Sequence, residues 1–369
     1  MRILIVGAGA VGGYFGGRLA QAGSDVTFLV RPSRAKQLSR DGLRIISPHG
    51  DAVLSPKLIS VDKIDTPYDL VFLSVKAYLL EAAMNDFAAA VGPETMIYPV
   101  LNGMRHIDLL TKRFGEHAVI GGVCLVAAEV DDQGRIVQLA DFQQLVYGER
   151  NGETTPRLKT LDATLHGAGF DARLSPDIMQ AMWEKWIQLA SLGAVTCLMR
   201  GTIGEIVAAP GGAELSIDVL NESAAVATAC GYKPSEKMLS RHAAAMTAPG
   251  SSLTSSMYRD LRKGAPVEAD HIVGDFIERG SAHGVATPLI ESRFRQSPRL
   301  SGQAPEALRD QFISEQAHFR RLHVNPLAKA TPPSLTQALF APEEQRVSRA
   351  ARSRATFSRA AMPRRSSGT

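Results

Sequence analysis

The sequence predicts an α/β fold, in which a doubly wound parallel sheet is followed by an all-helical domain. Two observations support this fold class. Up to about residue 175, short apolar runs typical of buried strands alternate with helical stretches. From Asp177 to about Arg293 the sequence has helical periodicity and no convincing strand. We therefore expect an α/β domain at residues 1–175 and a helical domain at residues 176–294.

A glycine-rich motif lies between the first strand and the first helix of the α/β domain. The strand pattern covers Ile3 to Val6, the helical stretch runs from Gly13 to about Ala22, and Val26 to Val30 is a second strand. The motif G-x-G-x-x-G consists of Gly7, Ala8, Gly9, Ala10, Val11 and Gly12. Its first glycine permits a tight turn, its second lets the backbone approach a pyrophosphate, and its third lets the helix pack closely. The helix N-terminus attracts the phosphates. The motif thus predicts a Rossmann-type dinucleotide-binding domain.

The residues after the second strand indicate which dinucleotide binds. NAD-binding units place an acidic residue about 20 residues past the glycines, where it hydrogen-bonds the ribose 2′-hydroxyl. This chain has Arg31 there, followed by Arg34 and Lys36, with no carboxylate until Asp41. A guanidinium suits a 2′-phosphate. The sequence therefore predicts NADPH as the cofactor, the alternative being a solvated basic loop.

Two polar residues follow later strands of the expected sheet. Lys76 ends the apolar run 70–75, and Asn102 ends the run 96–101. Ligands of such sheets bind beyond the carboxyl ends of the strands, so we expect both residues to face the dinucleotide cleft; the alternative is that they are plain surface residues. Strand-like runs at residues 131–148 are expected to complete the same sheet.

Composition excludes several classes of protein. Of the 369 residues, 45% are hydrophobic and 21% charged, as in ordinary globular enzymes. No apolar stretch approaches the roughly 20 residues of a membrane span, and the chain begins directly in a core strand, which argues against a signal peptide. The three cysteines are far apart and lack metal-ligand spacing. We expect a cytoplasmic protein with reduced thiols and no metal.

The last segment differs from the rest of the chain in charge and amino-acid composition. Residues 295–369 hold 13 Lys and Arg against 5 Asp and Glu, so residues 1–294 carry a net charge of −4 although the whole chain carries +4. The segment is rich in Pro, Ser, Ala and Arg. It is expected to be a disordered basic extension, with one helix around Pro305 to Leu322. Because the folded body is mildly acidic, the net charge does not indicate a nucleic-acid-binding fold.

Further landmarks keep the order and spacing of one family over about residues 1–290. They are GAGAVGGYFGGRLAQAG, Val75-Lys76-Ala77, Leu101-Asn102-Gly103-Met104, Met182-Trp183-Glu184-Lys185, Ser255-Ser256-Met257 and Glu268. With these landmarks the chain resembles the ketopantoate reductase (2-dehydropantoate 2-reductase) family. The resemblance implies NADPH-dependent reduction of 2-dehydropantoate to pantoate, a step toward pantothenate. It also implies an active site in the cleft between a Rossmann domain and a helical domain.

The resemblance implies a role for each matching residue. The glycine motif, Arg31, Lys76 and Asn102 would bind the cofactor. Lys185 would be the catalytic proton donor and would also attract the substrate carboxylate, because an ammonium can stabilise negative charge on the keto oxygen and then protonate it. Ser256 would bind substrate. Glu268 would act at the same catalytic site, orienting the ammonium or accepting a substrate hydroxyl.

The chain departs from the family at three substrate-binding asparagines. Leu189, Gly193 and Ile203 stand in their places, although Gln188 or Ser191 could replace one of them. The reaction type is therefore better supported than the substrate. The helix that the resemblance implies from about Thr287-Pro288 is interrupted after Phe294 by Arg- and Pro-rich sequence. Either an appended segment or a change of reading frame in the gene would produce this pattern.

Three functions remain open from the sequence. The first is an NADPH-dependent 2-keto acid reductase, ketopantoate reductase or a paralogue with a changed pocket. The second is another β-hydroxyacid or opine-type dehydrogenase with the same two-domain plan. The third is a non-catalytic NADP(H)-binding regulator that uses the basic extension. The expected partner is a small-molecule 2-keto acid, without metal or membrane. A homodimer is a possible assembly, since the sequence does not determine the oligomeric state.

Overall fold

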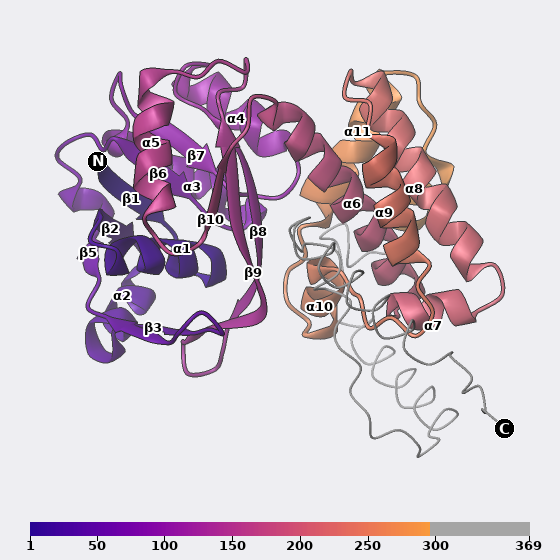
Figure 1. Cartoon of the computed structure of the whole chain (residues 1–369), viewed down its shortest axis with the longest axis horizontal. Coiled ribbons are helices and arrows are strands. Elements are labelled where there is room, and N and C mark those ends of the chain that lie inside the picture. Colours follow the sequence, from indigo (N-terminus) through magenta and orange to yellow (C-terminus); the bar gives the residue numbers. More distant parts are fainter. Residues whose placement is uncertain (296–369) are drawn as a thin grey trace, which may run out of the picture.

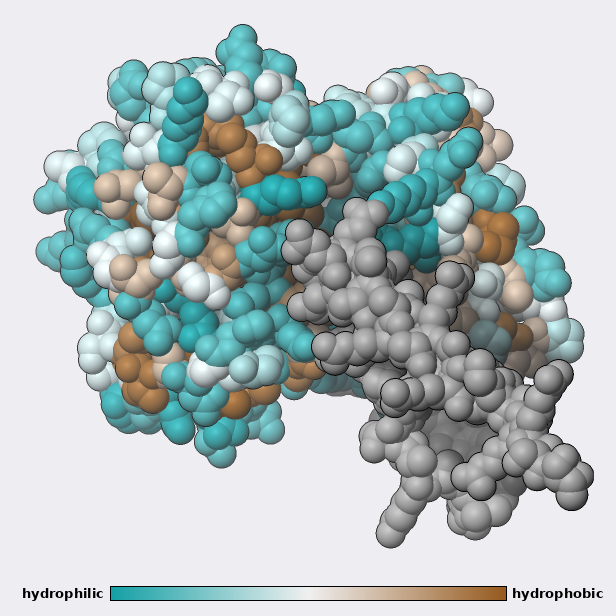
Figure 2. Space-filling model, viewed as in Figure 1, coloured by the Kyte–Doolittle hydropathy of each residue, from teal (hydrophilic) through white to brown (hydrophobic). Residues whose placement is uncertain are grey.

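The computed structural model describes residues 1–295, and the predicted extension at residues 295–369 lies, apart from Arg295, outside the described residues. Figure 1 shows an α/β part, indigo to magenta, beside a helical part, rose to orange, with α6 (Ile178–Met199) at their boundary. Within residues 1–295, no helix combines the length and apolar character that crossing a membrane requires. The face drawn in Figure 2 is mostly hydrophilic, with hydrophobic residues in scattered groups.

A five-stranded parallel sheet forms the centre of the α/β part. Its strand order is β5-β2-β1-β6-β7. Side chains alternate between two cores: Leu4 and Val6 of β1 belong to one, and Ile3 and Ile5 to the other. Both faces are therefore buried, as expected for a parallel sheet. The strands are β1 (Arg2–Val6), β2 (Asp25–Leu29), β5 (Lys57–Ile59), β6 (Leu70–Leu73) and β7 (Met96–Pro99).

Helices cover both faces of this sheet. Phe15 and Leu19 of α1 (Ala10–Gln21) join the core that contains Ile3 and Ile5. The opposite core receives apolar side chains from α3 (Leu80–Asp86) and α4 (Arg105–Phe114). The prediction of a doubly wound parallel sheet is confirmed.

A second sheet adjoins the first through a bridge between Ile97 of β7 and Val119, and here one prediction was wrong. Residues 131–148 do not complete the parallel sheet: they fall mostly within β9, which pairs antiparallel with β8 and parallel with β3 and β10. The cause is the tight turn at Asp131, whose carboxylate accepts hydrogen bonds from the backbone N–H of Gln133 and Arg135. Such a turn joins antiparallel neighbours. The strands are β3 (Leu43–Ile46), β4 (Ala52–Leu54), β8 (Gly121–Val130), β9 (Ile136–Gly148) and β10 (Asp171–Leu174). Outside the sheets, α2 (Pro32–Asp41) and α5 (Pro156–His166) complete the α/β part.

Helix α6 is the central element of the helical part. The Asp177 side chain caps it by accepting a hydrogen bond from Gln180 N–H. Trp183, Trp186 and Ile187 are buried, and the helix packs against β8 on one side and α8 on another. The other elements are α7 (Ile203–Ala208), α8 (Gly212–Ala229), α9 (Glu236–Met246), α10 (Ser256–Arg262), a π-helical segment (Asp270–Gly274), α11 (Asp275–Ala282) and α12 (Pro288–Arg295). The helical periodicity of residues 177–293 did not single out α7 as a separate helix.

Replacing Gly12 by alanine should destabilise the fold. The added Cβ would lie 2.1 Å from both the carbonyl oxygen of Gly7 and Oγ of Ser74. Overpacking of this kind costs about 1–3 kcal/mol, so urea titration should show a loss of that size in the free energy of unfolding. Gly167→Ala is the control, because a Cβ there meets no atom within 4 Å. Equal stability of the two variants would contradict this interpretation of the loop.

Candidate active site

The glycine loop leads from the carboxyl end of β1 into α1. Gly7 has φ of +95°, which suits glycine, and Gly12 packs against Gly7 and Ser74. A Cβ at Gly9 would meet nothing within 4 Å. Gly9 is also the N-cap of α1, and no side chain caps the helix. The first backbone N–H groups of α1 are thus arranged to receive a phosphate group, so this loop fits a dinucleotide.

Two arginines near the glycine loop differ in their contacts. Arg31 is exposed at the start of α2, two residues beyond the end of β2. Arg34 donates from Nε to the Ala8 carbonyl oxygen at 3.1 Å and from Nη1 to the Gly134 carbonyl oxygen at 3.0 Å. Burial lowers the pKa of Arg34. Arg34 therefore supports the loop, while Arg31 offers a guanidinium to a ligand.

Lys76 connects the α/β part to the helical part. Its Nζ lies 2.9 Å from Oδ2 of Asp260 and 3.4 Å from Oε2 of Glu268. The backbone N–H of Ala77 also donates to Oε1 of Glu268 at 2.8 Å. Burial acts to lower the pKa of Lys76, but the two carboxylates outweigh it and the pKa is raised. Sequence reasoning missed Asp260, because only the fold brings a residue 184 positions away to Lys76.

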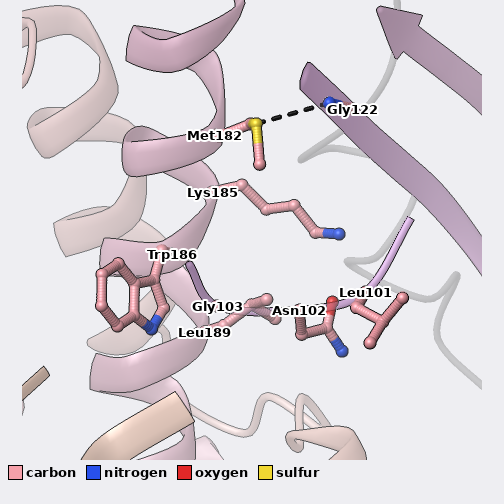
Figure 3. Close-up of a pocket in the computed structure, with 8 residues that line it drawn as sticks. All are labelled: Leu101, Asn102, Gly103, Gly122, Met182, Lys185, Trp186 and Leu189. Carbon is pink, nitrogen blue, oxygen red and sulfur yellow. Dashed lines mark hydrogen bonds between the residues drawn. The ribbon is translucent and has the colours of Figure 1, made fainter. Parts of the chain in front are cut away.

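A small pocket lies between α6 and the ends of β7 and β8. Met182, Lys185, Trp186 and Leu189 lie on one face of α6, at the spacing of successive helical turns. Figure 3 shows the Lys185 side chain extending from α6 into the space beside Asn102. Gly122 of β8 donates its backbone N–H to Sδ of Met182 at 3.3 Å, and this contact joins the two walls. The lining residues are Leu101, Asn102, Gly103, Gly122, Met182, Lys185, Trp186 and Leu189.

Lys185 lies in an environment that favours loss of its proton. Burial lowers the pKa of Lys185, and the electrostatic influence of Cys124 and Glu268 opposes this only in part. Burial also raises the pKa of the Cys124 thiol to about 12, so that thiol stays protonated at neutral pH. Glu268 meets Lys76 directly and acts on Lys185 only through space. The two lysines thus have opposite pKa shifts, which suits Lys76 to a permanent charge and Lys185 to proton transfer.

The loop after β7 holds Asn102 at the pocket. Gly103 has φ of +80°, and a Cβ there would lie 2.7 Å from the carbonyl oxygen of His271. His271 stacks on His106 with ring centroids 5.9 Å apart. Burial lowers the pKa of His271 to about 4 and that of His106 well below its usual value, so both rings are neutral. Sequence reasoning missed this pair, because the two histidines come from distant segments and carry no local signal.

Ser256 is the remaining residue expected at the site. It is the first residue of α10, is partly buried, and does not line the pocket around Lys185. The neighbouring Ser255 caps α10 and lies 2.8 Å from Oγ1 of Thr196 in α6. Among the described residues, no group of three or more His, Cys, Asp and Glu could hold a metal ion.

Three positions at which the resemblance implies asparagine contribute no polar side chain. Leu189 lines the pocket, and Ile203 is fully buried. At Gly193 an added Cβ would lie 2.0 Å from Cε of Met257, so this methionine fills the space. The wall beyond Lys185 is therefore apolar.

Two models of protein families match the chain. Ketopantoate reductase PanE/ApbA matches residues 3–152, and ketopantoate reductase PanE/ApbA C terminal matches residues 177–295. Over 292 residues the chain is 34% identical to "Uncharacterized oxidoreductase YkpB" of Bacillus subtilis (strain 168), a match that covers 79% of this chain and 96% of that protein. It is 28% identical over 297 residues to a 2-dehydropantoate 2-reductase of Halobacterium salinarum, with 79% and 96% covered.

A solved structure agrees with these matches. The crystal structure of 2-dehydropantoate 2-reductase from Geobacter metallireducens GS-15 superposes with a TM-score of 0.73 at 28% identity, covering 79% of this chain and 97% of that one. The two family models together match most of the chain, and the relatives are covered almost completely. The chain therefore belongs to the ketopantoate reductase family and is an oxidoreductase that acts on CH–OH groups.

Proposed function

We propose that this protein reduces a 2-keto acid to a 2-hydroxy acid with NADPH. The observation that carries the proposal is the position of Lys185, which lines the same pocket as Asn102. Burial at this position lowers the pKa of Lys185. Asn102 follows β7, and the glycine loop follows β1 of the same parallel sheet. The carboxyl ends of parallel strands lie at one edge, where ligands of this fold bind.

The proposed cofactor site uses residues at that edge. The residues of the glycine motif would hold the pyrophosphate, Arg31 the 2′-phosphate, and Lys76 and Asn102 the remainder of the dinucleotide. Bound NADPH supplies the hydride that reduces the keto carbon. Arg31 supports NADPH over NADH, because it is an exposed cation where an NAD-binding unit carries an acidic residue.

In the proposed mechanism Lys185 is the general acid. Its ammonium attracts the oxygens of the keto acid, stabilises the negative charge that develops on the keto oxygen, and donates a proton from Nζ. A lowered pKa makes Lys185 a stronger acid than a solvated lysine. We propose that Glu268, held by Ala77 and Lys76, acts at the same site, and that Ser256 binds substrate.

Two substrates are supported by different observations. Family membership favours 2-dehydropantoate, with pantoate as the product. The apolar residue Leu189 in the pocket wall favours a different 2-keto acid. The experiment that separates them is NADPH oxidation with a panel of branched 2-keto acids.

Lys185→Ala should lower kcat by about 100-fold or more, the usual scale of general acid catalysis. NADPH affinity, measured by fluorescence titration, should barely change, since the dinucleotide is assigned to the α/β part. Because the proton donor is lost on deprotonation, wild-type kcat should fall as pH rises through the lowered pKa of Lys185. Near-normal turnover of the variant on the best substrate would exclude this role.

Arg31→Ala should weaken NADPH binding by about tenfold, the scale of one charge-assisted hydrogen bond, and leave NADH binding unchanged. Arg34→Ala is the control: Arg34 supports the loop through Ala8, so its loss should weaken both dinucleotides alike. Equal affinities of the wild type for NADPH and NADH would contradict the assignment of Arg31.

Lys76→Ala and Glu268→Ala should not be additive. Lys76→Ala should raise the Kd for NADPH, whereas Glu268→Ala should lower kcat. The double variant should lose less kcat/KM than the product of the single losses, because the two side chains contact each other. Asp260→Asn is the control, since it removes the other carboxylate beside Lys76 and keeps Glu268. Full additivity of Lys76→Ala and Glu268→Ala would contradict a shared role.

A further inference from the structure

The substrate pocket has few groups that could pair with a polar substrate branch. Lys185 and Asn102 contribute an ammonium and an amide. Trp186 also lines the pocket, but its Nε1 already donates to the carbonyl oxygen of Ile272 at 2.9 Å. The other lining side chains, Leu101, Met182 and Leu189, are apolar. Gly103 and Gly122 add only backbone, and the N–H of Gly122 donates to Met182.

The polar side chains near Leu189 and farther along α6 do not line the pocket. Ser191 donates to the Ile187 carbonyl oxygen at 2.7 Å and contacts Oγ of Ser223 at 3.0 Å. Thr196 donates to the carbonyl oxygen of Leu192 and contacts Ser255. Gln188 does not line the pocket. Neither Ser191 nor Gln188 is therefore placed to hydrogen-bond a substrate branch beside Leu189.

The next turn of α6 closes the same wall with apolar atoms. Gly193 follows Leu189 by one turn, and Cε of Met257 occupies the space where a side chain at Gly193 would begin. Met257 is itself only 3% exposed, so it is fixed in the core. A larger residue at Gly193 would collide with it. Leu189 is thus the position at which the chemistry of the wall can be changed without rebuilding its packing.

We infer that this site is specific for 2-keto acids whose branch is apolar and carries no hydroxyl group. The inference rests on the proposed 2-keto acid reduction and names the substrate class. Lys185 takes the keto oxygen and, with Ser256, the carboxylate, while Asn102 stays with the dinucleotide and the branch packs against Leu189 and Leu101. A hydroxyl on the branch would lose its water on entering the pocket and meet Leu189, an unpaired state that costs binding energy.

A matched pair of substrates tests the inference. 2-Dehydropantoate and 3,3-dimethyl-2-oxobutanoate differ only in that a hydroxyl group of the first is a hydrogen in the second. The wild type should show a kcat/KM higher by about 10- to 100-fold for the compound without the hydroxyl, since an apolar pocket discriminates on this scale. Equal values, or a preference for 2-dehydropantoate, would overturn the inference.

Variants at Leu189 show whether this side chain sets the preference. Leu189→Asn should shift the ratio of the two kcat/KM values by about tenfold toward 2-dehydropantoate, because the amide can pair with the hydroxyl. Leu189→Met, which keeps the wall apolar at similar volume, should change both values by the same factor. An unchanged ratio in Leu189→Asn would overturn the assignment of this residue. If neither compound nor any other 2-keto acid is reduced, the proposed function itself is wrong. If both are reduced and the hydroxylated one faster, only the inference is wrong.

Discussion

The packing of α6 against the carboxyl end of β7 and the amino end of β8 is the constraint on which the rest of the structure depends. One face of this helix carries Lys185 and meets the strand ends, while Trp183 and Trp186 anchor it in the helical part. Trp186 also stacks edge-to-face on Phe276 of α11, with ring centroids 4.6 Å apart. An aromatic anchor of this size fixes the position of the helix. The position of the Lys185 ammonium therefore follows from hydrophobic packing rather than from an ion pair.

The two lysines, both of which Glu268 influences, show how one structure sets different electrostatic conditions at two positions. Lys76 is 44% exposed and meets two carboxylates, whereas Lys185 is partly buried and has no carboxylate in direct contact among the described residues. Lys76 keeps its charge, which suits a group that binds phosphate or ribose. Lys185 is shifted toward release of its proton. Surface ion pairs such as Lys263–Glu129 also cross between the two parts, but exposed pairs of this kind contribute little stability.

Local sequence patterns predicted the fold and the glycine loop, and long-range contacts account for what they missed. The glycine motif can be predicted from the sequence because the requirement for each glycine is set by residues only a few positions away. The second sheet was misassigned because an apolar run looks the same in either sheet, and the turn at Asp131 decides its partner. Lys185 stands out only through the family resemblance, since its neighbours on α6 are apolar. The meeting of Lys76 with Asp260 and of Gly193 with Met257 joins segments more than 60 residues apart.

The stability of the contact between the α/β part and the helical part depends on the protonation of the stacked histidines behind the Asn102 loop. His106 belongs to α4 and His271 to the π-helical segment, so the stack spans the boundary. Burial depresses both pKa values, that of His271 to about 4 from a usual 6.5. The unfolded chain therefore binds protons more readily than the folded one below about pH 6.5. The stability that these neutral rings contribute is present above that pH and is lost as the pH falls toward 4. Acid therefore weakens the contact beside Gly103, and with it the loop that presents Asn102.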